Sequence, residues 1–406
     1  MSNLPLENEC CGCGACVDAC RHNAIELIES SNNFFIPFIN QNKCINCGLC
    51  EKKCNILNPP IKNKGKETKA FAAWTTDNEL IKKCASGGAF GEIAKHYLTK
   101  SKNFVVIGAS LLRDSSVKHI EITNIKELPK LLNSKYQQSN ATGIYKTVRN
   151  RLNEGKYVIF SGTPCQIAAL YAFLGKQAKD INNLLTIEVI CHGVPSNYLH
   201  RLSLKINNAK QIISYRTKSH GWLDGNRVTY LDKENSEREI KYRTSDFLFR
   251  AYLNLNSLRE RCYSCPYATI NRVADITLGD FWGFNRHKIN NFMGISLVLA
   301  NTQKGKNVIS EQNGLHLQST DWDEFLQYNQ NLFMPTNKQL YSISNNIYRI
   351  KKLPIFIQKI IFQQGFSNKF MDYLYRKGLN IIFSHKRKNI YNEIQLQYKK
   401  ALKDCK

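Results

Sequence analysis

The sequence has no run of eighteen apolar residues, the length that a membrane-crossing helix needs. Its start also lacks the basic segment and apolar stretch of a secretory signal, because Met1 leads into Asn, Glu and Cys. A cytoplasmic protein is therefore expected. In that compartment the fifteen cysteines stay reduced, so clustered cysteines are interpreted as metal ligands before disulfides.

Acidic residues are scarce: 32 Asp and Glu stand against 57 Lys and Arg, a net charge of +25. Residues 1–60 hold four basic and six acidic side chains, whereas residues 344–406 hold fourteen and three. A positive field attracts acidic redox proteins, phosphorylated substrates, nucleic acid or an anionic membrane. A solvated basic face explains the same counts. Because no nucleic-acid-binding module is recognisable, we expect no nucleic acid partner.

The length of 406 residues exceeds one ordinary core, so several domains are expected. Residues 58–66, rich in Pro, Lys and Gly, are typical of a linker. We expect a module at 1–60, one domain in two parts at 68–155 and 156–335, and a basic helical tail at 340–406.

After the linker, predicted strands and helices alternate. Strands are expected at 71–74, 104–107, 157–160 and 185–190, and helices at 86–99, 142–152, 165–174 and after Pro195. This alternation predicts an α/β fold with ligands at the turns from strand to helix. A period of two with turn residues predicts a hairpin at 212–243.

The first sixty residues contain a repeated cysteine pattern. Cysteines spaced x2, x2 and x3 occur twice, as Cys10, Cys13, Cys16 and Cys20, and as Cys44, Cys47, Cys50 and Cys54. This is the bacterial ferredoxin spacing, in which the fourth cysteine ligates the other cluster. We therefore predict two 4Fe–4S clusters in a ferredoxin-like α+β module, one held by Cys10, Cys13, Cys16 and Cys54, the other by Cys20, Cys44, Cys47 and Cys50. Zinc knuckles are the alternative, but zinc sites usually have a longer gap between cysteine pairs.

Two features depart from the usual pattern. Arg21 and Asn55 follow the fourth cysteines, where proline is usual. These changes remove no ligand but can alter loop rigidity or cluster potential. Cys11 lies outside the spacing and is expected to be a spectator.

Four later cysteines occur at chemically suggestive places. Cys165 lies between a strand and a helix, Cys191 ends the next strand, and Cys262 and Cys265 form a Cys-x2-Cys pair. They form one further 4Fe–4S site if the fold gathers them. A four-cysteine zinc site and a reactive Cys165 at a helix N-terminus are the alternatives from these residues alone.

The region 68–330 resembles the beta subunits of coenzyme F420 hydrogenase/dehydrogenase. The resemblance depends on several motifs in order: Ala85-Ser-Gly-Gly-Ala89, Ser161-Gly-Thr-Pro-Cys-Gln166, Cys191-His-Gly193, the Cys262–Cys265 pair, and Ala274-Asp-Ile-Thr-Leu-Gly-Asp-Phe-Trp-Gly283. It implies an α/β flavin-binding domain with FAD, a third 4Fe–4S cluster, and transfer of electrons at the flavin. A plant chlorophyll hydroxymethyl reductase of similar fold implies that the substrate need not be a deazaflavin. The attached dicluster module also resembles proteins found among bacterial surface-polysaccharide genes. Cys84 and Ala85 stand where relatives often have further serines before Ser-Gly-Gly.

The resemblance suggests roles for particular residues. Backbone N–H groups at helix N-termini bind phosphate, although Ser-Gly-Gly is also a common cap and close-packing device. His192 and His220 are candidate proton donors, since a histidine pKa lies near neutrality; a lone histidine is more often structural. The candidate flavin contacts are Ser86, Gly87, Gly88, Lys135, Tyr136, Ser139, Gly162 and Thr163.

The leading hypothesis is an oxidoreductase that takes electrons from an acidic carrier, such as ferredoxin or flavodoxin, through the clusters to FAD. The substrate is expected to be a small molecule or glycan-linked compound. A non-catalytic electron relay to a partner enzyme is the second hypothesis. The basic, aromatic stretches 348–362 and 373–388 fit peripheral contact with the inner face of the membrane, or helices that cap the domain.

Overall fold

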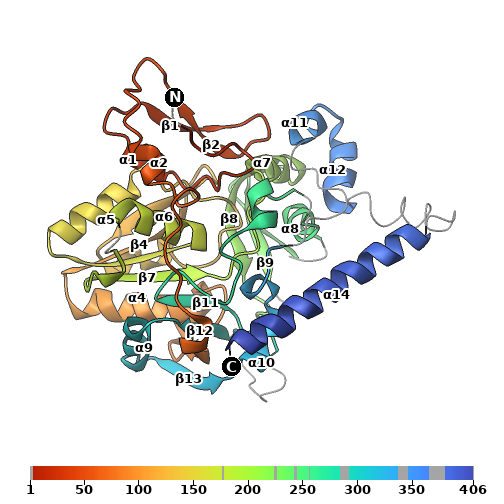
Figure 1. Cartoon of the computed structure of the whole chain (residues 1–406). Coiled ribbons are helices and arrows are strands. Elements are labelled where there is room, and N and C mark those ends of the chain that lie inside the picture. Colours follow the sequence, from red (N-terminus) through yellow and green to blue (C-terminus); the bar gives the residue numbers. More distant parts are fainter. Residues whose placement is uncertain are drawn as a thin grey trace.

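The computed structural model describes residues 3–175, 178–223, 226–241, 245–255, 257–283, 292–336, 346–364 and 380–405. Within 380–391 it describes the path of a helix but not the side chains. Figure 1 shows a small N-terminal module beside a larger body in which helices flank a central sheet. The predicted α/β class is therefore observed.

The N-terminal module contains the same turn twice. Each short helix directly follows a glycine with positive φ, +84° at Gly14 and +70° at Gly48, a conformation that other residues rarely adopt. Between the two turns lies an antiparallel hairpin in which Ile25 is opposite Ile39. The elements are α1 (Ala15–Ala19), β1 (Ile25–Glu29), β2 (Phe35–Ile39) and α2 (Leu49–Lys52).

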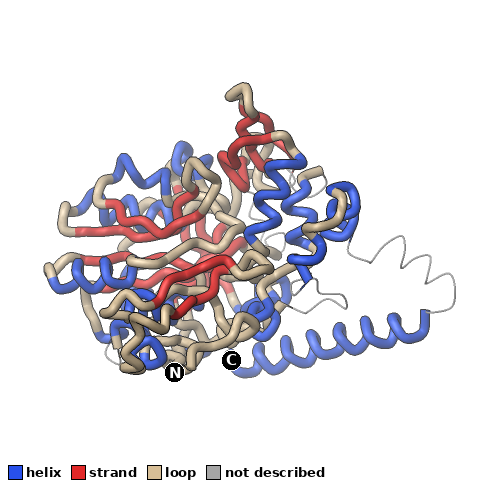
Figure 2. Tube along the Cα trace, turned by 90° about the horizontal axis from the view of Figure 1, so that it is seen from above, coloured by secondary structure: helices blue, strands red, loops and turns tan. Residues whose placement is uncertain are grey.

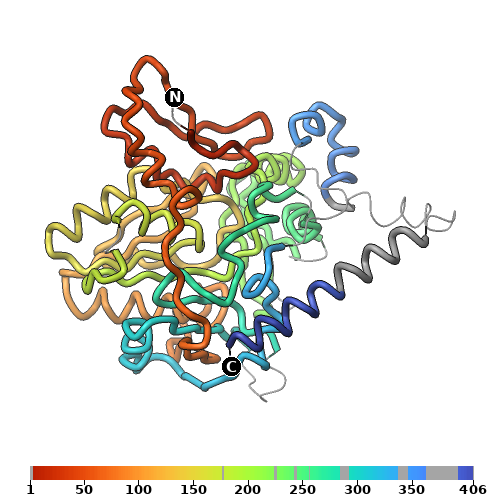
Figure 3. The backbone as a smooth tube through the Cα atoms, viewed as in Figure 1, coloured from red at the N-terminus to blue at the C-terminus, as the bar shows by residue number. Residues whose placement is uncertain are grey.

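The predicted linker lies against the body of the protein. Figure 3 shows this segment descending from the module toward β3 (Lys69–Thr75). The backbone N–H of Asn63 donates to Arg272 O (2.7 Å), and that of Gly65 donates to Asn271 Oδ1 (2.9 Å). Hydrogen bonds along its length make this segment an anchored strap, which its composition did not predict.

The central sheet has strands in the order β13-β3-β12-β11-β7-β6-β4-β5. β4, β6, β7 and β11 are parallel, as alternating strands and helices predict, while β5, β12 and β13 are antiparallel to their neighbours. The remaining strands are β4 (Phe104–Leu111), β5 (Val117–Ile122), β6 (Tyr157–Gly162), β7 (Leu184–Val189), β11 (Ile276–Asp280), β12 (Ser296–Ala300) and β13 (Leu315–Thr320).

Helices bury both faces of this sheet, as Figure 2 shows from above. Successive strand residues face opposite ways, and Val105 and Val106 accordingly belong to different cores. Two helices cover the Val105 face, α5 (Ile144–Asn153) and α6 (Pro164–Leu174). Three cover the other, α3 (Asn78–Lys83), α4 (Ala89–Lys100) and α9 (Gln303–Ser310).

A second, smaller sheet occupies the region where one hairpin is predicted. It has three antiparallel strands, because turn residues interrupt the chain twice. The antiparallel hairpin expected at 212–243 is therefore confirmed, and a third strand extends it. The strands are β8 (Ala209–Thr217), β9 (Arg227–Asp232) and β10 (Glu237–Lys241), and the nearby helices are α7 (Asn197–Ile206), α8 (Phe247–Leu253), α11 (Ile347–Ile350) and α12 (Ile355–Gln364).

The last helix, α14 (Asn380–Cys405), packs its end on the body. Ala401 and Cys405 belong to one core with Trp322 and Phe325 of α10 (Trp322–Phe325). The rest of α14 extends outward in Figure 1. The side chains of the predicted stretch 373–388 lie outside the described residues. Among the described helices, none is both long and apolar enough to cross a membrane.

Substitution of Gly87 by alanine is expected to destabilise the sheet strongly. A Cβ there would lie 2.3 Å from Ala73 O and 2.6 Å from Ser296 N, both backbone atoms of strands. We expect a loss of about 2–4 kcal/mol in the free energy of unfolding, measured by denaturant titration. Gly155→Ala is the control for backbone strain without a clash: its Cβ would meet open space, but its φ of +74° disfavours alanine, so a smaller loss of about 1 kcal/mol is expected. Equal losses in both variants would contradict this packing role.

Candidate functional site

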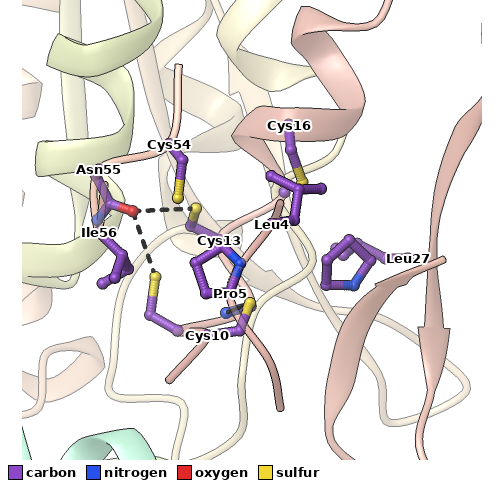
Figure 4. A pocket seen from close by; sticks show the side chains of 13 residues that line it. Leu4, Pro5, Cys10, Cys13, Cys16, Leu27, Cys54, Asn55 and Ile56 are labelled. Carbon is purple, nitrogen blue, oxygen red and sulfur yellow. Dashed lines mark hydrogen bonds between the residues drawn. The ribbon is translucent and has the colours of Figure 1, made fainter. Parts of the chain in front are cut away.

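The first four predicted ligands line one pocket. Cys10, Cys13, Cys16 and Cys54 line this pocket, with Leu4, Pro5, Leu27 and Ile56 as apolar walls (Figure 4). Gly12 has φ of +66° and Gly14 of +84°, so the loop turns tightly between its cysteines. These are the four cysteines that the sequence spacing assigns to one cluster.

The other four predicted ligands line a second pocket. It contains Cys20, Cys44, Cys47 and Cys50 together with Ile25, Ile45 and Leu49. The side chain of Cys47 is exposed, and Ile45 beside it is 61% exposed. This pocket therefore lies nearer to solvent than the first, in which Cys13, Cys16 and Cys54 are buried.

The thiols of the first pocket fit an iron–sulfur cluster by their number and chemistry. Burial raises the pKa of Cys10 to about 11 and also raises that of Cys16 and Cys54. Iron must therefore displace protons when it binds. Four thiolates around an apolar space are the ligand set of a 4Fe–4S cluster. In the described ranges, no three Cys, His, Asp or Glu side chains converge as ligands of a single metal ion.

The module is held on the body by a carboxylate that caps a helix. Asp18 is 4% exposed and accepts hydrogen bonds from the backbone N–H groups of Gly143 (2.6 Å), Tyr145 (3.0 Å) and Lys146 (3.3 Å). A negative charge at a helix N-terminus is favoured by the unpaired N–H groups and the helix dipole. Asp18 of the module thus caps α5 of the body.

Two buried side chains hold the first cysteine loop from the other side. Gln138 Nε2 donates to Cys11 O (2.9 Å) and Gly12 O (2.8 Å). Arg259, 1% exposed, donates to Cys10 O (3.2 Å) and to Gln138 Oε1 (2.6 Å). Because backbone carbonyls of the loop are the acceptors, these bonds fix its path.

Asn55, where proline is usual, lies between the first pocket and the later cysteines. Its Nδ2 donates to Cys165 O (3.0 Å) and Tyr267 OH (3.1 Å). Its Oδ1 accepts from Cys11 Sγ (3.6 Å) and Cys13 Sγ (3.7 Å), as Figure 4 shows. Proline could make none of these side-chain bonds. The departure noted in the sequence is thus a contact between module and body.

The expectation that Cys11 is a spectator stays a prediction. Cys11 is buried, and its thiol lies close enough to that of Cys165 to shift the pKa of Cys165. The same thiol contacts Asn55. Cys11 therefore stands between the first pocket and the α/β body, a position that spacing alone does not reveal.

The four later cysteines share one neighbourhood. The N–H of Gly193 donates to Cys191 Sγ (3.4 Å), and a Cβ on Gly193 would lie 3.6 Å from Cys262 Sγ. Burial, and then the charges of Cys191 and Cys265, raise the pKa of Cys262. The neighbouring thiol of Cys11 and burial raise the pKa of Cys165, and Cys191 is near enough to raise it further. These contacts come from the ends of β6 and β7 and the turn at Glu260–Ser264.

A buried ion pair lies next to this group. Arg272 and Glu188 are 1% and 0% exposed, and Arg272 Nε donates to Glu188 Oε1 (2.5 Å). The positive charge of Arg272 acts to lower the pKa of Cys191 and Cys265, although burial outweighs it. A fixed cation beside thiolates stabilises negative charge at this place.

The Ser86-Gly-Gly88 segment has structural contacts of its own. Ser86 Oγ donates to Ile295 O (2.7 Å), and Gly87 O accepts from the N–H of Thr75 (2.8 Å). Gly88, with φ of +87°, directly precedes α4. The segment does open a helix, and close packing alone accounts for Gly87.

The other flavin candidates lie on the β4–β5–β6 side of the sheet. Thr163 caps α6 in a reciprocal arrangement with Gln166, directly after Gly162. Ser139 Oγ bonds His119 Nδ1 (2.7 Å), and Tyr136 stacks edge-on against Phe249, with ring centroids 4.6 Å apart. These contacts position the residues but do not by themselves bind a ligand.

Two lysines offer the clearest fit for a phosphate group. Lys135 Nζ donates to Leu132 O (2.6 Å), and burial lowers its pKa to about 7. Lys218 Nζ donates to Ser86 O (2.9 Å) and Met293 O (2.6 Å), and burial lowers its pKa to about 8. Neither pairs with a carboxylate within the described residues, and Lys218 is buried whereas Lys135 is half-buried; a cation removed from water is costly without a counter-charge. Cys84, whose pKa burial raises to about 12, lies near both lysines.

Sequence reasoning missed Lys218 and its neighbour Arg216. Arg216 is 4% exposed and forms an ion pair with Asp280 (2.9 Å), to which Trp222 Nε1 also donates (3.2 Å). Trp222 stacks on Trp282, with ring centroids 5.2 Å apart. The motif that contains Asp280 and Trp282 could be recognised in the sequence. Its partner Arg216 on β8 belongs to no motif, so the sequence did not indicate this contact.

The two candidate proton donors differ in setting. The side chain of His192 keeps access to solvent, but the protein packed around it lowers its pKa. The negative charge of Asp280 acts in the opposite direction and raises that pKa. His220 is exposed. Their proposed roles as proton donors stay predictions.

The chain is an iron–sulfur electron-transfer protein, since residues 9–56 match the model of the 4Fe–4S dicluster domain. Residues 155–321 match the family model described as the C terminus of the beta subunit in coenzyme F420 hydrogenase/dehydrogenase. The chain is thus an oxidoreductase-type protein related to those beta subunits, as the motifs predict. A chain of the F420-reducing NiFe hydrogenase complex from Methanosarcina barkeri is 15% identical, with a TM-score of 0.45 over 80% of this chain and 96% of that one. A comparison with curated protein sequences finds no match.

Replacement of Asn55 by alanine is expected to weaken the contact between module and body. It leaves Cys165 O without its amide donor inside the protein, so the free energy of unfolding should fall by about 1–3 kcal/mol. Denaturant unfolding under anaerobic conditions measures this. Asn42→Ala in the exposed part of the same module is the control and should change little. An unchanged Asn55→Ala midpoint would contradict the role of this contact.

Proposed function

We propose that the protein is an iron–sulfur flavoprotein oxidoreductase that passes electrons between a soluble carrier and an organic substrate. The observation that carries this proposal is the position of Asn55, which binds Cys11 and Cys13 of the module on one side and Cys165 of the body on the other. It joins the dicluster module to the second group of cysteines in one buried region. Single electrons could then move from the module into the α/β body.

The proposed entry point is the second pocket. Cys47 is exposed there, whereas Cys13 in the first pocket is buried and contacts Asn55. Exposed Arg21 and Lys43 directly flank Cys20 and Cys44. Positive side chains around an accessible cluster favour an acidic carrier such as ferredoxin or flavodoxin.

A third 4Fe–4S cluster and FAD complete the proposed path. Cys165, Cys191, Cys262 and Cys265 would hold the cluster, which their shared neighbourhood supports. Lys135 and Lys218 would bind the flavin phosphates, helped by N–H groups at the starts of α4 and α6. A bound flavin supplies the exchange between one-electron and two-electron transfer. The role in surface-polysaccharide synthesis stays a prediction from the resemblance.

Metal and flavin analysis of protein purified without oxygen tests this proposal. We expect about twelve irons, matching acid-labile sulfide, and about one FAD per chain. Zinc should be absent. About eight irons with no flavin would contradict the proposed path beyond the module.

Cysteine substitutions assign the third cluster. The double variant Cys262→Ser, Cys265→Ser should lose about four irons and keep about eight. Cys405→Ser, at a buried cysteine in the core around α14, is the control and should keep the full content. An unchanged iron content in the double variant would show that these thiols hold no cluster.

The pH dependence of FAD binding tests Lys135. Its pKa is lowered to about 7, so the ammonium that attracts phosphate is fully present below pH 7 and is lost above it. Affinity for FAD should therefore fall as pH rises above about 7, by up to about tenfold per unit. Equilibrium binding of FAD to flavin-depleted protein measures the profile. Lys135→Met should bind FAD more weakly and with a flatter profile; an unaltered profile would contradict the assignment.

The second candidate function is a non-catalytic electron relay. It is favoured by the internal bonds of Ser86, Thr163 and Lys135, which occupy the polar atoms proposed to bind flavin. A relay should copurify with a partner enzyme and show no substrate-dependent reoxidation of a flavin. Stopped-flow absorbance under anaerobic conditions separates the two functions.

A further inference from the structure

Helix α12 is apolar on both of its sides, but only one side is buried. Its inner side packs on α8 and α7: Phe362 lies edge-on to Phe247, with ring centroids 6.4 Å apart, and Gln358 Oε1 accepts from Tyr198 OH (2.6 Å). Asn254 Nδ2 also donates to Phe362 O (2.9 Å). These contacts fix which side of α12 faces outward.

The outer side of α12 exposes large apolar side chains. Phe356 is 66% exposed, Ile360 is 49% and Ile355 is 37%, and Leu353 just before the helix is 40%. In Figure 1, α11 and α12 lie on the outer flank of the molecule, beyond α7 and α8. We call these four residues the α12 patch. A contiguous apolar patch on a helix indicates a surface that another phase or molecule covers.

The segment that carries the α12 patch has only basic charged side chains. Residues 346–364 contain Arg349, Lys351, Lys352 and Lys359 and neither Asp nor Glu. Lys352 and Lys359 are exposed beside the patch. Apolar side chains flanked by lysines match a bilayer surface, where acyl chains accept the first and anionic headgroups attract the second. An acidic protein would match the charge, but its surface would provide less apolar area than acyl chains to bury an exposed phenylalanine.

We propose that the α12 patch binds the surface of an anionic membrane, with Phe356 and Ile360 inserted and Lys352 and Lys359 at the headgroups. This proposal is independent of the flavin and of the third cluster, because no residue of either site belongs to it. It describes contact with one leaflet and places the electron-transfer body beside the bilayer.

Vesicle flotation of the full chain, purified with its clusters, tests the proposal. The protein should float with vesicles of phosphatidylcholine and phosphatidylglycerol, bind phosphatidylcholine alone at least about tenfold more weakly, and dissociate in high salt. Failure to float with the anionic vesicles would overturn the proposal and leave an acidic protein as the partner to seek. Equal binding to both kinds of vesicle would overturn the role of the lysines.

Paired variants locate the surface. Phe356→Glu with Ile360→Glu should lower binding by about tenfold or more, whereas Ile61→Glu with Leu317→Glu adds the same charge at other exposed apolar sites and should have a much smaller effect. Lys352→Gln with Lys359→Gln should weaken only the binding to anionic vesicles. All four positions substituted in these two α12 variants are exposed, so thermal unfolding measured by circular dichroism should be unchanged. Wild-type binding by both α12 variants, or an equal loss in the control pair, would place the membrane contact elsewhere.

Discussion

The arrangement depends on the rigid attachment of the cysteine module to the α/β body. Electron transfer weakens steeply with distance, so redox centres in two modules need a fixed, close contact. Here Asp18 caps α5, Arg259 and Gln138 bind the first cysteine loop, and Asn55 reaches the loop at Cys165. Each of these four polar side chains is less than one-tenth exposed. Buried hydrogen bonds of this kind favour one arrangement over others, since a shift leaves the bonded groups unpaired.

The same contact shows how the body contributes to the first pocket. The backbone carbonyls of Cys10, Cys11 and Gly12 are all acceptors for side chains of the body, and Tyr145 OH donates to Cys13 O (2.9 Å). Donors placed around ligand loops orient the ligands and tune a metal site. The pocket is thus assembled by both parts of the chain, although its cysteines belong to one.

Much of this could be predicted from sequence, and the reasons for the rest are physical. Cysteine spacing is a local pattern, so the two pockets could be predicted from it. The same pattern predicted that Cys54 joins the first three cysteines and that Cys20 joins the later three. The parallel strands could be predicted from the alternation of strands and helices along the chain. The antiparallel strand β12 between β3 and β11 did not, because strand order depends on long-range pairing that leaves no local signal. Asn55 and Cys11 were visible as departures, but their role required knowing that Cys165 lies beside them.

We propose that this chain holds three iron–sulfur centres, from the exposed Cys47 to the group of half-buried cysteines around Cys191. Crystals grown anaerobically, with anomalous diffraction measured at the iron and zinc absorption edges, test it most directly. We expect iron at both pockets and a third iron centre among Cys165, Cys191, Cys262 and Cys265. Zinc, or no metal, among those four cysteines would contradict it.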